Sequence, residues 1–280
     1  MEVLPLRVRS VLLVYKKSAR WDSEQFKTAH QAHQRALEQV RRLLRRSGIR
    51  FKAVYRARLV DYAPYDGVIS VGGDGTFLEA AHRIRNQWIL GVNSDPERSA
   101  GSFCVADGSS VEKILDRILK NGAKIQRLHR VQLELDGKRL GVPVLNDILI
   151  THRKPAAMSR YWIQAGRIRE KQRSSGLWIS TAAGSTGAIR SAGGRKLPRE
   201  SKKLQYRPRE LYRRSGLRYR RSRLRYRLTG GVIPPNRPVR IGSLMREGLI
   251  CVDGEHWAFP FRYGGRLSIH PFPYPLRVIR

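Results

Sequence analysis

Val71-Gly72-Gly73-Asp74-Gly75-Thr76-Phe77-Leu78 is the stretch of sequence that restricts the fold most. It follows a short apolar run, Val68–Val71, that is typical of a buried strand, and it precedes a helical pattern. Glycines at this point allow a tight turn and let backbone N–H groups approach a phosphate at the N-terminus of a helix. The spacing matches neither the dinucleotide fingerprint G-x-G-x-x-G nor a P-loop, because no Lys-Ser/Thr pair follows. The stretch therefore predicts a strand–loop–helix unit that binds phosphate.

Asp74 is the informative residue of this loop, because a carboxylate beside bound phosphates is costly unless it faces a hydroxyl group or a metal ion. It is therefore a candidate to accept a proton from a substrate hydroxyl or to hold Mg²⁺. The alternative is structural: Asp74 could simply cap the helix that follows.

The first part of the chain alternates strands with helices. Apolar runs at Val8–Tyr15, Phe51–Val60, Val68–Val71 and Trp88–Val92 predict strands, and helical patterns lie between or after them. Strands and helices in this order, with short connections, predict a parallel sheet with right-handed crossovers.

After Ala123 the pattern changes to short strands with turns between them. Asp136-Gly137 and Asp253-Gly254 each separate two apolar runs and are typical of tight hairpins. We therefore predict an α/β fold in which a Rossmann-like α/β domain is followed by a β-rich, antiparallel, sandwich-like domain.

Two further motifs contain residue types that bind ligands. Asn146-Asp147 stands at the start of a predicted strand, where an amide and a carboxylate can fix a ligand, although Asn-Asp is also an ordinary turn. The segment Ser174–Gly187 runs from an apolar strand into a loop of small residues, and Ser191–Gly194 extends it. Small side chains let a flat or phosphorylated ligand lie against the backbone, but a tightly packed turn has the same composition.

Together these motifs resemble the NAD kinase family. The Gly-Gly-Asp-Gly-Thr loop (Gly72–Thr76, the GGDGT loop), the Asn-acid pair (Asn146 and Asp147) and the Gly-Ser-Thr loop (Gly184–Thr186) occur in the family's order and spacing. The resemblance covers nearly the whole chain, and the coincidence of several motifs makes it specific.

Two other stretches, Gly91–Ser99 and Gln172–Leu177, are similar to the branch that includes the mitochondrial and plant NADH-preferring kinases, and Met245–Gly254 also fits. The more common family pattern has an Asp and a Tyr where this chain has Ser175 and Ala188. The aromatic stack on adenine and one carboxylate contact are therefore not expected here, and the site resembles a variant of that branch.

The resemblance implies an architecture and a reaction. Residues 1–122 would form the α/β domain with the GGDGT loop, residues 123–262 the β-rich dinucleotide-binding domain, and residues 263–280 a segment that returns to the first domain. NAD(H) would lie in the cleft between the domains. The reaction implied is phosphoryl transfer from ATP, or from polyphosphate, to the 2′-hydroxyl of the adenosine ribose, with Mg²⁺ or another divalent cation as cofactor. A homodimer or homotetramer is expected.

The resemblance also implies roles for individual residues. Asp74 matches the family's general base, and no residue is assigned as a dedicated metal ligand. Asn146 and Asp147 match the pair that binds the dinucleotide, with Asp in place of the usual Glu. The residues expected to bind the nucleotides are Gly72, Gly73, Gly75, Thr76, Asn93, Asn146, Asp147, Ser175, Thr186 and Ser191.

The net charge of +34 is far above what solubility requires and indicates polyanionic partners. Tyr206–Arg227 is the most basic segment, and part of it alternates Arg with Leu or Tyr, which is typical of a half-buried strand with a solvated outer face. A dedicated binding surface is the alternative interpretation. The charge makes a nucleic-acid-binding protein one alternative function, and the GGDGT loop makes a lipid kinase of the diacylglycerol or sphingosine type another.

No apolar run approaches the roughly 18–20 residues of a membrane-spanning helix, so no membrane partner is expected. Cys104 and Cys251 cannot by themselves form a disulfide framework or a zinc site. The first predicted strand begins within about ten residues of Met1, which leaves no room for a transit segment. We therefore expect a reduced, cytoplasmic protein.

Overall fold

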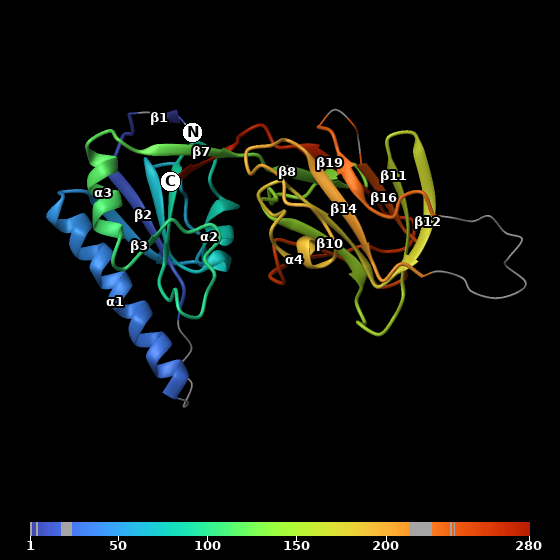
Figure 1. The fold of residues 1–280 in the computed structure, drawn as a ribbon, viewed down its shortest axis with the longest axis horizontal. Coiled ribbons are helices and arrows are strands. Elements are labelled where there is room, and N and C mark those ends of the chain that lie inside the picture. Colours follow the sequence, from blue (N-terminus) through green and yellow to red (C-terminus); the bar gives the residue numbers. More distant parts are fainter. Residues whose placement is uncertain (1, 4, 18–23, 213–225, 236, 238) are drawn as a thin grey trace, which may run out of the picture. The chain divides into compact units, whose positions relative to one another are not determined.

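The computed structural model describes residues 2–3, 5–17, 24–212, 226–235, 237 and 239–280 (Figure 1). The chain divides into two compact units. Unit 1 contains residues 1–128 and 274–280, and unit 2 contains residues 129–273.

A mixed sheet runs through unit 1 in the strand order β1-β7-β20-β5-β4-β2-β3, with β6 beside β5. The strands are β1 (Glu2–Val3), β2 (Ser10–Tyr15), β3 (Arg50–Tyr55), β4 (Gly67–Gly72), β5 (Trp88–Asn93), β6 (Ala106–Asp107), β7 (Lys124–Leu128) and β20 (Leu276–Ile279). Pairing is parallel from β3 to β20, as predicted, but β7 and β1 are added antiparallel at one edge. This edge departs from the predicted parallel sheet: β7 pairs antiparallel with β20, which comes from the far end of the sequence, and β1 pairs antiparallel with β7.

Helices cover both faces of this sheet. α1 (Glu24–Arg46) and α3 (Val111–Leu119) pack on one face, and α2 (Asp74–Ala81) lies on the other (Figure 1). α1 and α3 bury apolar residues at helical spacing against the strands, so the core of unit 1 is a helix–sheet layer. Residues of this core include Leu37, Val40, Leu44, Ile114 and Ile118.

The topology defines where unit 1 is suited to bind a ligand. The connection from β2 through α1 leads to β3 on one side, whereas the connection from β4 through α2 leads to β5 on the other. The direction of winding therefore reverses between β2 and β4. In open α/β sheets, ligands bind outside the carboxyl ends of the strands at such a switch point. The GGDGT loop begins there, at the end of β4.

Unit 2 consists of antiparallel sheets that share one apolar core. One sheet has the order β15-β14-β13-β10-β17-β18, with β10 (Asp147–His152), β13 (Gly176–Ser180), β14 (Leu204–Arg209), β15 (Gly231–Ile233), β17 (Gly248–Val252) and β18 (Trp257–Pro260). The other has the order β12-β11-β16-β19-β8-β9, with β8 (Val131–Leu135), β9 (Lys138–Arg139), β11 (Ser159–Ala165), β12 (Ile168–Ser174), β16 (Val239–Ser243) and β19 (Arg266–Pro271). A short helix, α4 (Ala188–Ser191), follows β13. The predicted α/β fold with a sandwich-like β-rich part is confirmed.

The two predicted Asp-Gly hairpins form turns of different lengths. Asp136 and Gly137 have φ angles of 51° and 79° and join a directly paired Leu135 and Lys138, as in a two-residue turn of type I′. Asp253 also has a positive φ, of 50°, but Val252 pairs with Trp257, which leaves a four-residue connection. In this second turn the Asp253 carboxylate accepts the backbone N–H of Asn146.

The Arg-rich segment Tyr206–Arg227 is described only at its ends. Tyr206 lies in β14 with a buried side chain, and Leu228 is buried in the same core. Residues 213–225, which hold most of the predicted alternation, lie outside the described residues. None of the described helices combines the length and the apolar composition that a membrane span requires.

Candidate functional site

The GGDGT loop joins β4 to α2 in a turn that leaves no room for side chains at its first two glycines. A Cβ atom on Gly72 would lie 2.3 Å from Thr76 Oγ1, and one on Gly73 would lie 2.6 Å from Ser99 Oγ. Gly75 is exposed, and a Cβ atom there would lie 3.4 Å from the guanidinium nitrogen Nη1 of Arg56. The loop therefore presents an open helix N-terminus with an arginine beside it, an arrangement that attracts anions.

Asp74 is the first residue of α2, and it does not cap the helix. The N-cap position is Gly73, which makes no side-chain cap hydrogen bond. The Asp74 carboxylate instead accepts backbone N–H groups of the loop after β5, from Ser102 at 3.0 Å and from Phe103 at 2.8 Å. A carboxylate has about four acceptor positions, so two bonds of this kind leave acceptor capacity for a ligand.

Asn93 ends β5 and uses its buried side chain to shape the following loop. Its Nδ2 donates to the carbonyl oxygen of Ser99 at 2.8 Å, and its Oδ1 accepts the N–H of Asp95 at 3.2 Å. Gly101, with a φ of 55°, lies against it, because a Cβ atom there would be 2.4 Å from Asn93 Nδ2. Asn93 thus supports the loop that reaches Asp74.

His33 was missed by sequence reasoning. It lies on the apolar side of α1, fully buried, with its Nδ1 3.0 Å from Ser94 Oγ. Ser94 in turn donates its N–H to the carbonyl oxygen of Gly72 at 3.0 Å. Burial and the positive charge of Lys16 lower the pKa of His33 to about 4, so the imidazole is neutral at pH 7. A polar residue in the apolar stripe of α1 was the available signal.

In unit 2, Asn146 and Asp147 form a turn that is anchored by a third residue, Asp253. The Asp253 carboxylate accepts the backbone N–H groups of Leu145, Asn146 and Asp147 at 2.9, 2.8 and 3.0 Å. Sequence reasoning identified Asp253 only as a hairpin residue. The turn is therefore fixed by a carboxylate contributed from the β17–β18 connection.

Asp147 is buried, with only 5% of its surface exposed. Burial, and then the negative charge of Asp253, raise the pKa of Asp147 to about 7. Asn146 Nδ2 donates to Asp147 Oδ2 at 3.1 Å. At neutral pH this carboxyl group is therefore present in both its protonated and ionised forms, and the protonated form can donate a hydrogen bond to a ligand.

The Gly-Ser-Thr loop packs against this turn. A Cβ atom on Gly184 would lie 2.1 Å from the carbonyl oxygen of Asn146, so only glycine fits. Ser185 is buried and bonded to Ala182 and Leu197, whereas Thr186 and Ser191 are exposed. The structure thus brings Asn146, Asp147 and the Gly-Ser-Thr loop together and leaves the hydroxyls of Thr186 and Ser191 accessible.

Ser175 is not part of this cluster. It precedes β13, in which Ser180 at the other end pairs with Asp147. The backbone N–H of Ser175 donates to the carbonyl oxygen of Arg209 at 3.1 Å. Ser175 and Ser180 are five positions apart along the chain, about 16 Å at the usual rise per residue of a strand.

Comparison with known proteins identifies the family. No protein-family model matches the chain. A probable NADH kinase of Oryza sativa subsp. japonica is 32% identical over 270 residues, which cover 88% of this chain and 81% of the rice protein. The chain belongs to the NAD kinase family.

Solved structures of the family have the same fold. An NAD kinase from Archaeoglobus fulgidus in complex with ATP superimposes with a TM-score of 0.73 at 20% identity, over 97% of this chain and 93% of that one. Yeast NADH kinase complexed with NADH superimposes with a TM-score of 0.75 at 15% identity, over 98% of this chain and 83% of that one. The predicted resemblance is confirmed, and nothing in these comparisons supports the lipid kinase or the nucleic-acid-binding protein.

Proposed function

We propose that this chain is an NAD(H) kinase that transfers the γ-phosphoryl group of ATP to the 2′-hydroxyl of the adenosine ribose of NAD(H), giving NADP(H). The observation that carries the proposal is the GGDGT loop with Asp74 at the N-terminus of α2, in a chain that belongs to the NAD kinase family. A transferase of this kind depends mainly on positioning its substrates and on neutralising the charge of the phosphates.

In this proposal the GGDGT loop binds donor phosphates and Asp74 accepts the proton of the ribose hydroxyl. Gly72 and Gly73 bring the backbone close to the phosphates, Thr76 supports the turn beneath them, and the exposed Gly75 leaves the helix N-terminus open. The N–H groups of Ser102 and Phe103 fix the position of the Asp74 carboxylate, and a carboxylate is a group that can take a proton.

The Asn146–Asp147 turn is proposed to bind the dinucleotide in unit 2. The support for this assignment is that the amide, the buried carboxyl group and the Gly-Ser-Thr loop lie together, with the hydroxyls of Thr186 and Ser191 exposed beside them. These groups can bond the hydroxyls and ring nitrogens of a nucleoside. Ser175 stays a sequence-based assignment, because it lies at the opposite end of β13.

Mg²⁺ is proposed to enter with the donor nucleotide. The described residues contain no group of three or more His, Cys, Asp or Glu side chains that could hold a metal ion. Mg²⁺ is commonly held by substrate phosphates with one or two carboxylates, so the residues present fit a metal of this kind, with Asp74 as the carboxylate nearest the loop. Such an ion would neutralise the charge of the donor phosphates.

A substrate matrix tests the function. Purified protein is incubated with Mg²⁺ and either ATP or polyphosphate, and with either NAD⁺ or NADH, and NADP(H) formation is measured. We expect turnover with ATP, and the two acceptors will show which redox form is preferred. Absence of NADP(H) in every combination would overturn the proposal.

A homodimer or homotetramer and a cytoplasmic location are proposed as well. The support for the location is that Cys104 and Cys251 are both free thiols, as expected in a reducing compartment. Light scattering on the eluted protein measures the oligomer, and a monomer at micromolar concentration would contradict the first proposal. Cell fractionation tests the second.

A further inference from the structure

A cavity of about 570 Å³ lies in unit 1 at the amino ends of the parallel strands. Its walls come from residues 5–7, 61–63, 65–66, 83 and 85–88, and from Arg277 on β20. Asp66 directly precedes β4 and Trp88 begins β5, whereas the GGDGT loop follows the last residue of β4. The six residues of β4 place the cavity about 20 Å from that loop, so it is a separate place in the fold.

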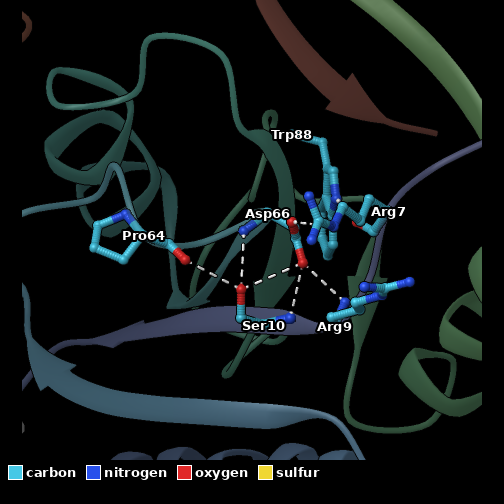
Figure 2. Close-up of polar contacts among 6 residues, drawn as sticks. All are labelled: Arg7, Arg9, Ser10, Pro64, Asp66 and Trp88. Carbon is cyan, nitrogen blue, oxygen red and sulfur yellow. Dashed lines mark hydrogen bonds and ion pairs between the residues drawn. The ribbon is translucent and has the colours of Figure 1, made fainter.

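Part of the cavity wall is held together by hydrogen bonds of Asp66 and Trp88. The Asp66 carboxylate accepts the backbone N–H groups of Arg9 and Ser10, each at 2.9 Å, and the Nε1 of Trp88 donates to the carbonyl oxygen of Arg7 at 3.1 Å (Figure 2). The Nε of Arg7 lies 3.4 Å from Asp66, so the Arg7 side chain forms an ion pair with this carboxylate. The Asp66 carboxylate is therefore engaged by two backbone N–H groups, and its negative charge is already paired with Arg7.

A second set of bonds fixes the segment that carries Arg85. Gln87 is buried, and its Nε2 donates to the carbonyl oxygen of Tyr62 at 2.9 Å. Its Oε1 accepts the backbone N–H groups of Arg85 and Asn86 at 3.2 and 3.3 Å. The side chain of Arg85 is exposed and makes no hydrogen bond or ion pair within the described part of the chain. A rigid backbone thus presents a free guanidinium group at the rim.

Arg277 supplies another positive charge that its own surroundings do not neutralise. It lies on β20 directly opposite Arg127 on β7, and residues directly opposite in an antiparallel pair share one face of the sheet. Partial burial, and then the charge of Arg127, lower the pKa of Arg277. Its Nη2 donates to the carbonyl oxygen of Asn86, which places the guanidinium next to the Arg85 segment.

The remaining charges of the lining nearly balance. Arg83 is paired with Glu79 at 3.3 Å, and Asp66 with Arg7. Asp61 is exposed and accepts the backbone N–H of Ala63 at 2.9 Å. The unbalanced charge of the cavity is therefore positive and is concentrated on Arg85 and Arg277.

We propose that this cavity is a second anion site, which binds an oligophosphate group through the guanidinium groups of Arg85 and Arg277. Guanidinium groups bind phosphate oxygens in a bidentate manner, so two of them lining one cavity can engage two linked phosphates. The cavity volume falls in the range of small-molecule sites, which is larger than one phosphate needs. The ligand chemistry is therefore that of a pyrophosphate group, either inorganic or at the end of a nucleotide.

Calorimetric titration with inorganic pyrophosphate tests the site, in about 0.3 M salt to suppress general binding to this basic chain. The test variants are the double change Arg85→Ala/Arg277→Ala and the single change Arg85→Glu. Because the native Arg85 side chain makes no hydrogen bond or ion pair within the described residues, the single change should leave the fold intact. The charge-matched control is Arg139→Ala/Arg167→Ala, at exposed positions of unit 2. We expect both test variants to bind at least tenfold more weakly than the wild type and the control.

Equal affinity in the wild type, the test variants and the control would overturn the proposal, as would absence of binding to the wild type. Repeating the titration with ATP distinguishes the two sources of the ligand. A second equivalent of bound ATP that disappears in Arg85→Glu identifies the phosphate tail of a nucleotide, whereas loss of pyrophosphate binding alone identifies the inorganic anion. The result does not depend on the proposed kinase activity.

Discussion

Asp74 in unit 1 and Asp147 in unit 2 both begin a regular element next to a glycine-containing loop, yet their surroundings differ. Asp74 is partly exposed and accepts two backbone N–H groups, which fix its orientation. Asp147 is buried and faces the Asp253 carboxylate, so its neutral form is favoured and its pKa is about 7. The first is suited to accept a proton, and the second to donate a hydrogen bond while it stays neutral. The environment, and not the residue type, assigns the two roles.

The largest effect is expected from Asp74→Asn. An amide cannot accept the ribose proton, and general-base help is typically worth about 10²–10⁴-fold in rate. We therefore expect kcat for NADP(H) formation to fall by that factor, with little change in the thermal midpoint. Asp116→Asn, an exposed carboxylate on α3, is the control. If Asp74→Asn kept near-full turnover, Asp74 would not be the base.

The next effect is expected from Gly184→Ala. The added methyl group would lie 2.1 Å from the carbonyl oxygen of Asn146 and must displace the Asn146–Asp147 turn. Overpacking of this kind costs about 1–3 kcal/mol. We expect a rise in KM for NAD(H) with a smaller change in KM for ATP. Gly141→Ala, where nothing lies within 4 Å, is the control. Equal changes in both KM values would argue against a dinucleotide role for the turn.

A smaller effect is expected on the pH dependence of stability from Asp147→Asn. The folded pKa of Asp147, about 7, exceeds its ordinary value of 3.8, so the folded state binds the extra proton between these pH values. The stability that this contributes is complete below pH 3.8 and is lost as the pH rises through 7. Urea unfolding at pH 5 and pH 8 should show the wild type losing more stability than Asp147→Asn, by a few kcal/mol at about 1.4 kcal/mol per pKa unit. Parallel pH profiles would disprove the buried-carboxyl interpretation.

The smallest effect is expected from His33 in unit 1, whose contribution to the pH dependence of stability has the opposite sign to that of Asp147. Its folded pKa, about 4, is below its ordinary value of 6.5, so the unfolded state binds more protons in this window. Stability should therefore fall as the pH drops from 6.5 to 4, and His33→Asn should flatten that fall. Unfolding curves at pH 4.5 and 7 measure it. A steeper acid loss in His33→Asn than in the wild type would contradict the assignment.

Much of the fold was predictable because its signals are local. The buried run before Gly72 and the Asp136-Gly137 turn each specify their backbone within a few residues, and both are found as predicted. The antiparallel edge of the unit 1 sheet was not predictable, since the pairing of β7 with β20 joins segments about 150 residues apart and leaves no local pattern.

The site was predictable to a lesser degree, for a related reason. Motif residues such as Asp74 and Asn146 could be singled out, but Asp253 and His33 act through tertiary contacts. In the sequence, Asp253 is explained as an ordinary residue of an Asp-Gly turn. His33 is explained as one polar residue among the apolar residues of a helix. Only the three backbone N–H groups around Asp253 and the burial of His33 distinguish them.

The place of β20 in unit 1 has a consequence for biosynthesis. β20 pairs with β5 on one side and β7 on the other, and Val278 and Ile279 are fully buried. These residues are synthesised after the whole of residues 129–273. The sheet of unit 1 therefore has a gap between β5 and β7 until β20 has been synthesised, whereas the strands of unit 2 precede β20 in the sequence. Unit 1 therefore completes its sheet only after all the strands of unit 2 have been synthesised, although most of unit 1 precedes unit 2 in the sequence.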